Sequence, residues 1–154
     1  TPKPSSAASD VYKRQEFNHS GDEQVHFLQI WIVPSENGTE PGYQQVSVSE
    51  AEKRGQFRLI VSPQGDNGSL TVRQDMKIYA GLFDGAEQAT FDLDPDRYAY
   101  VHVARGNIRV NGIEFRTGDG ARIRQEDKLT FTDGDQAEVL LFDLRPVEVN
   151  HPAR

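Results

Sequence analysis

Few side chains in this 154-residue chain are suited to chemistry on a substrate, and one reactive type is missing altogether. The sequence contains four histidines and no cysteine. Without cysteine there can be no thiolate nucleophile, no disulfide and no cysteine-based metal centre. The same composition is compatible with a reducing, cytoplasmic environment.

The histidine with the most suggestive surroundings is His102. It stands two residues after Tyr100 and four after Tyr98, so the three side chains share one face of a strand. Because imidazole titrates near neutral pH, His102 could act as an acid or a base in a cavity. A single histidine on a strand is more often a packing residue, and we favour that interpretation.

A second group of interest is the acidic series Asp92, Asp94 and Asp96. Carboxylates at alternate positions could contact a hard cation such as calcium or magnesium. Because Pro95 lies among them, the series is more simply explained as solvated residues of a turn.

The elements that must position these residues are short strands. From Phe57 onward, apolar runs alternate with Gly, Asn and Asp turns, and Asn111-Gly112 is a strong hairpin signal. Further turns are expected at Arg105–Asn107 and after Phe131. This pattern predicts an all-β antiparallel barrel or sandwich. The predicted strands are Phe57–Ser62, Leu70–Arg73, Lys77–Phe83, Ala89–Leu93, Tyr98–Ala104, Ile108–Val110, Ile113–Arg116, Ala121–Arg124, Lys128–Phe131 and Ala137–Leu144.

The first part of the chain has a different character. Residues 1–15 form a polar leader, which we expect to be disordered or an artefact of the sequence. The run Val25–Val33 is apolar on both faces and predicts a buried strand that ends at Pro34. Ser47–Arg54 predicts a short helix, with a capping box formed by Ser49 and Glu52.

Charge and hydropathy argue against two classes of partner, nucleic acids and membranes. The net charge is −7, so direct binding to nucleic acid is disfavoured. The mean hydropathy is −0.67, and no apolar run approaches the roughly 18 residues that a membrane span requires. We also find no secretory signal, and we expect a cytoplasmic protein without membrane contact.

The stretch from Tyr98 to Phe131 resembles the two motifs of the cupin jelly-roll barrel, with Gly106 closing the first and Gly118 opening the second. In cupins, three histidines and a glutamate in these motifs bind a metal. Here Ala99 stands at the glutamate position and Leu129 at the third histidine. The resemblance therefore implies a barrel without a metal or other cofactor. The remaining matched positions hold Leu93 and Pro95 (or Asp92 and Asp94) for the histidine pair, and Arg124, Glu126 and Asp133 in the second motif.

Several further stretches closely resemble the pirin family, which includes quercetin 2,3-dioxygenase-like bacterial proteins. They are EFNHSGDEQVHFLQIWIVP, GTEPGYQQ, LIVSPQGDNGSL, IYAGLFDG and AEVLLFDL, and together they span Glu16 to about Pro146. The resemblance implies a bicupin, in which the N-terminal cupin holds a divalent metal (Fe, or Cu, Mn, Ni or Zn) and the C-terminal cupin usually does not.

By the same resemblance, Glu16 matches the glutamate ligand of the N-terminal cupin and Asn18 matches a motif asparagine. Arg14 stands where a histidine ligand is expected. We therefore expect four parts: the leader 1–15, the end of an N-terminal cupin with a linker (16–46), a C-terminal pirin-type cupin (47–148) and a tail (149–154). The strand Val25–Val33 would be left over from the missing cupin, with apolar surface exposed.

Three functions remain open at this stage. The resemblance implies a fragment of a metal-dependent quercetin 2,3-dioxygenase-like oxygenase, inactive alone, whose partners are the missing cupin and a flavonol-like substrate. The alternative is a non-catalytic pirin-type regulatory module that binds a protein. A third possibility is a ligand cavity lined by aromatic residues, although aromatic residues at strand spacing more often form core. The residues concerned are Tyr79, Phe83, Phe91, Tyr98, Tyr100 and His102.

Overall fold

The structure is a computed structural model that describes residues 17–146. The chain divides into two units, Thr1–Trp31 and Ile32–Arg154, and the helices and strands of the described residues all belong to the second. They follow in the order α1 (Glu50–Lys53), β1 (Phe57–Ser62), the 3₁₀ turn η1 (Asp66–Gly68), β2 (Leu70–Thr71), β3 (Met76–Phe83), β4 (Ala89–Asp92), β5 (Tyr98–Val110), β6 (Ile113–Arg116), β7 (Gly120–Ile123) and β8 (Lys128–Leu144). Within residues 17–146, none of the helices has the length and apolar character needed to cross a membrane.

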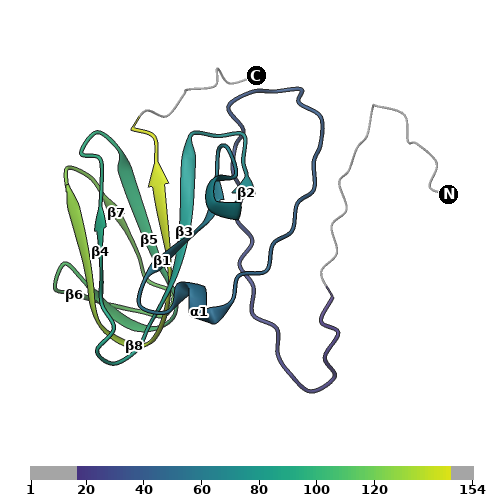
Figure 1. The fold of residues 1–154 in the computed structure, drawn as a ribbon. Coiled ribbons are helices and arrows are strands. Elements are labelled where there is room, and N and C mark those ends of the chain that lie inside the picture. The colour runs from purple at the N-terminus through teal and green to yellow at the C-terminus, as the bar shows by residue number, and fades with distance from the viewer. Residues whose placement is uncertain (1–16, 147–154) are drawn as a thin grey trace. The chain divides into compact units, whose positions relative to one another are not determined.

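The strands form one eight-stranded sheet in the order β2-β1-β3-β8-β5-β6, with β4 paired to β8 and β7 paired to β5. Its pairings are antiparallel, except that β1 and β2 run parallel. The two long strands β5 and β8 pair along most of their length, and the sheet curls with them (Figure 1). The predicted all-β cupin architecture is confirmed.

The same two strands contain the main errors of the strand prediction. The sequence predicts turns at Arg105–Asn107 and after Phe131, but β5 and β8 run straight through both places. The ladder between them shifts register there instead, which marks β-bulges. These bulges bend the two strands without ending them.

The bend depends on Gly106. Its φ is +70°, and a Cβ atom at this position would run into the backbone carbonyl oxygens of Asp135 and Gln136. On the facing strand, Asp133 and Gln136 also have positive φ, at 53° and 46°. The bulges of the two strands therefore lie against each other, and only glycine fits at the contact.

The predicted hairpin between β5 and β6 is confirmed. Asn111 and Gly112 have φ of 49° and 79°, as a type I′ turn requires. The Asn111 side chain also accepts a hydrogen bond of 2.8 Å from the backbone N–H of Thr130, which fixes the hairpin to β8.

The core lies on the concave face of the sheet and is apolar. Alternate residues of β3, β5 and β8 point into it, as the two-residue period of a strand demands. Phe57, Tyr79 and Phe91 pack against this cluster from its edge. The buried members are Phe83, Leu93, Ala99, Val101, Val103, Ile108, Val110, Leu129, Phe131, Ala137, Val139 and Leu141.

The predicted helix forms, with its capping interaction. The Glu52 carboxylate accepts hydrogen bonds of 2.9 Å from the Ser49 backbone N–H and 2.8 Å from the Ser49 hydroxyl. These bonds, together with nearby Arg58, lower the pKa of Glu52. Gly55, at φ +65°, ends the turn and leads into β1.

The predicted strand Val25–Val33 is wrong, because residues 25–33 form no strand in the described part of the chain. A strand needs a neighbour for its backbone hydrogen bonds, and within the described sheet no strand pairs with residues 25–33. The expectation of exposed apolar surface is confirmed. The exposed side chains are Val25, Phe27, Leu28, Ile30, Trp31 (87% exposed) and Val33.

The loop that follows is attached to the barrel by polar contacts. The backbone N–H of Ser35 donates to the Arg73 carbonyl at 2.9 Å, and Gln74 Nε2 donates to the Val33 carbonyl at 2.7 Å. Further along, Gln44 Oε1 accepts a 2.7 Å hydrogen bond from the backbone N–H of Thr71. The loop is thus held beside β2 and the start of β3.

Candidate functional site

In the shorter-spacing match, the four cupin ligand positions of this barrel hold Leu93, Pro95, Ala99 and Leu129; in the longer-spacing match, the exposed Asp92 and Asp94 take the place of the first two. Leu93, Ala99 and Leu129 are 7%, 2% and 0% exposed, and all three belong to the core cluster. Methyl and methylene groups offer no lone pair to a metal, so these residues do not fit the metal that the cupin motifs hold elsewhere. Among residues 17–146, no group of three or more His, Asp or Glu side chains is arranged to hold a metal ion.

The other metal candidate, Glu16, lies outside the described residues. Its motif neighbour Asn18 is described, and it makes local bonds. Asn18 Nδ2 donates to the Glu23 carbonyl at 2.7 Å, and Oδ1 accepts from the Ser20 N–H at 3.1 Å. Asn18 therefore organises a turn in the first unit of the chain.

Asp94 and Asp96 lie in a turn, the interpretation favoured from the sequence, whereas Asp92 is the last residue of β4. Asp92, Asp94 and Asp96 are all exposed. Asp94 Oδ1 accepts the backbone N–H of Asp96 at 3.0 Å, as in an Asx turn. Asp92 lies 3.7 Å from the ammonium of Lys128 on the paired strand.

His102 shares a strand face with Tyr98 and Tyr100, as predicted, and that face is the outer one. Ala99 and Val101, the residues between them, point into the core. The ring centroids of Tyr100 and Phe142 lie 5.8 Å apart. Arg124 stacks on the Tyr98 ring, with its Cζ atom 4.3 Å from the ring centroid. The imidazole is half-buried on this outer face, so His102 does not line the interior of the barrel.

The six aromatic residues considered as one cavity lining therefore lie on opposite faces of the sheet. Phe83 is buried, and Tyr79 and Phe91 pack against the core with their ring centroids 4.8 Å apart. Residue alternation correctly groups the side chains within one strand, but it does not show which face of the strand is turned inward.

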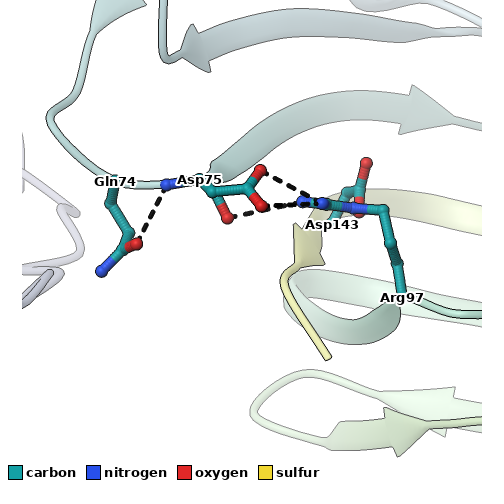
Figure 2. A network of polar contacts seen from close by, with 4 residues as sticks. All are labelled: Gln74, Asp75, Arg97 and Asp143. Atoms are coloured by element: carbon teal, nitrogen blue, oxygen red, sulfur yellow. Dashed lines mark hydrogen bonds and ion pairs between the residues drawn. The ribbon is translucent and has the colours of Figure 1, made fainter. Parts of the chain in front are cut away.

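A polar network, which the sequence does not reveal, lies where β3 and β5 begin and β8 ends (Figure 2). Arg97 Nε donates to Asp143 Oδ1 at 2.5 Å, and Arg97 Nη1 donates to Asp75 Oδ2 at 3.1 Å. The Asp75 backbone N–H in turn donates to Gln74 Oε1 at 2.9 Å. Burial acts to lower the pKa of Arg97, but the hydrogen bonds to Asp75 and Asp143 outweigh it and raise that pKa.

Beside this network is an open pocket of about 520 Å³ between α1, β1, η1 and β3. Tyr79 lies in its wall. Burial, followed by the nearby Asp143 carboxylate, raises the pKa of the Tyr79 phenol, so the group remains a neutral hydrogen-bond donor at physiological pH. The other lining residues are Glu52, Gln56, Phe57, Arg58, Leu59, Asp66, Asn67 and Lys77. Of these lining residues, Tyr79 is the one that the sequence analysis named as a candidate for a ligand cavity.

Comparison with known proteins agrees with the fold and the motifs. Residues 59–144 match the quercetinase C-terminal cupin domain of the pirin family. Quercetin 2,3-dioxygenase of Escherichia coli K12 is 36% identical over 141 residues, which cover 92% of this chain and 60% of that protein. A pirin-like protein of Caulobacter vibrioides is 30% identical over 122 residues, covering 79% of this chain and 53% of the relative.

Solved structures give the same picture. The crystal structure of YhhW from E. coli superposes with a TM-score of 0.70 at 36% identity, over 77% of this chain and 49% of that one. The structure of the same pirin in complex with nickel(II) also matches, with a TM-score of 0.70. The chain thus spans between about half and 60% of the length of these relatives. It belongs to the pirin family, and its β-barrel is the family's C-terminal cupin domain.

Proposed function

We propose that this chain is the C-terminal cupin portion of a metal-dependent, quercetin 2,3-dioxygenase-like oxygenase whose metal site lies in an N-terminal cupin. The proposal rests on relatives that bear that enzyme name and extend well beyond the matched region. A relative of known structure binds nickel(II), which supports a divalent metal in the longer protein.

The single observation that most supports a metal site in the N-terminal cupin, and none in this one, is that apolar side chains fill this barrel. Leu93, Ala99 and Leu129 occupy three of the four ligand positions of the shorter-spacing match with buried hydrocarbon, so the interior of this cupin offers no place for a metal-bound substrate. Its role in the longer protein is then structural support for the neighbouring cupin. Fold alone does not decide catalysis, so the test must be chemical.

The experiment compares this chain with a longer protein in which an N-terminal pirin cupin precedes it. Metal content and quercetin turnover are measured for both. We expect bound metal and turnover in the longer protein and neither in this chain. Metal without turnover in the longer protein would favour the regulatory, protein-binding alternative, and quercetin turnover by this chain alone would overturn the proposal.

A further inference from the structure

The pocket between α1, β1, η1 and β3 has a rigid apolar floor. Phe57 and Leu59, which lie on the face of β1 that is turned toward the core, line it. The Phe57 ring is held by three other rings, with centroids 4.6 Å away at Phe131, 5.3 Å at Phe83 and 6.0 Å at Phe91. An apolar surface of this kind suits an apolar or aromatic group.

Four charged side chains surround the pocket, and two of them, Glu52 and Arg58, form an ion pair with each other. Arg58 Nε lies 3.4 Å from Glu52 Oε1, and Arg58 Nη2 donates to the Asn67 carbonyl at 2.6 Å. Glu52 also receives the two hydrogen bonds from Ser49. This pair stiffens the rim and leaves little charge for a ligand.

The other two charges are not compensated. Among the described residues, no hydrogen bond or ion pair engages the Lys77 ammonium or the Asp66 carboxylate, and the two do not pair with each other. Both line the same pocket, with the Tyr79 phenol beside Lys77 on the same face of β3. The pocket thus presents one free cation, one free anion and one neutral donor above an apolar floor.

We propose that this pocket binds a small zwitterionic amino acid with an aromatic or apolar side chain. Its carboxylate accepts hydrogen bonds from Lys77 and Tyr79, its ammonium group pairs with Asp66, and its side chain packs on Phe57 and Leu59. A simple anion is repelled by Asp66, and a simple cation is repelled by Lys77. The proposal is independent of the metal and of quercetin turnover.

The test is an NMR titration of the full chain with L-phenylalanine, followed through backbone amide shifts. We expect saturable shifts around Asp66, Lys77 and Tyr79, with a dissociation constant on the order of 1 mM, as befits a ligand of this size. Phenylacetate lacks the ammonium group and phenethylamine lacks the carboxylate, and each should bind at least about 5-fold more weakly.

Substitutions of Lys77 and Asp66 test the role that each charge has in binding phenylalanine. Lys77→Met and Asp66→Asn should each weaken phenylalanine binding by about 5-fold or more, whereas Lys77→Arg should retain it. Lys128→Met is the matched control, since Lys128 pairs with Asp92 away from the pocket, and it should leave binding unchanged. If Lys77→Met does not fold, Asp66→Asn and the two analogues still decide the question. Absence of saturable shifts, equal binding of either analogue, or unchanged binding by Asp66→Asn overturns the proposal.

Discussion

Arg97 and Asp143 join two parts of the chain that lie 46 residues apart. Arg97 precedes β5, Asp143 lies near the end of β8, and their side chains are 20% and 16% exposed. Asp143 pairs across the sheet with Ala99, one of the apolar residues at the cupin ligand positions. The end of the barrel is therefore closed by an ion pair, next to a core that is hydrocarbon.

Replacing Arg97 by Met should destabilise the domain by about 1–3 kcal/mol, because the half-buried Asp143 carboxylate loses its main partner. The free energy of unfolding is measured by urea denaturation. The double variant Arg97→Met/Asp143→Leu should recover part of the loss, since no buried charge is then left alone. A cost for Arg97→Met no larger than the roughly 0.5 kcal/mol of an exposed pair such as Lys128–Asp92 would contradict this role.

Gly106→Ala should cost about 3 kcal/mol or more, because a methyl group meets two carbonyl oxygens at the bend of β5 and β8 and the backbone is also strained. Gly85→Ala is the matched control. Gly85 has φ +62° but nothing within 4 Å of the added Cβ, so it should cost only about 1 kcal/mol. Equal unfolding midpoints for the two variants would show that the close contact at Gly106 has no energetic effect.

Tyr79 should make the domain lose stability in alkaline solution. Its pKa is raised in the folded protein above the ordinary value of 10.0, so the unfolded chain releases its proton first. The contribution is complete below pH 10 and is lost as pH rises through the folded pKa. Tyr79→Phe should therefore show a shallower fall in stability than the parent chain above pH 10. Parallel profiles for the two proteins in that range would contradict the assignment.

Trp31 provides a direct probe of the exposed apolar segment, because it is the sole tryptophan of the chain. With 87% of its surface exposed, its fluorescence should be quenched by acrylamide almost as readily as in the unfolded chain. In a longer protein that carries the N-terminal cupin, we expect the segment to be covered and the quenching to fall. Equal quenching in the two folded proteins would show that the cupin does not cover Trp31.

The sequence predicted those features that local chemistry determines. Asn111-Gly112 makes its hairpin because both residues accept positive φ, and Glu52 reaches back to Ser49 within a single turn. The bends of β5 and β8 were misread as turns. Gly106 has the same local signature in either case, and only the paired strand decides that the ladder continues.

The candidate site was less accessible to prediction, because it is built from contacts distant in the sequence. Nothing near Arg97 indicates Asp143 as its partner, and Lys77 and Asp66 become notable only once the fold places both in one pocket. Val25–Val33 has the composition of a buried strand, but composition supplies no neighbour to pair with.

Titration of the isolated chain with nickel(II), with the bound metal counted per chain after gel filtration, tests the central claim most directly. The claim is that apolar side chains fill the interior of this barrel and that the barrel binds no metal ion. We predict no nickel that survives gel filtration, and no change in bound nickel when Leu129 is replaced by Ala. One nickel ion per chain, retained through the column, would contradict the account.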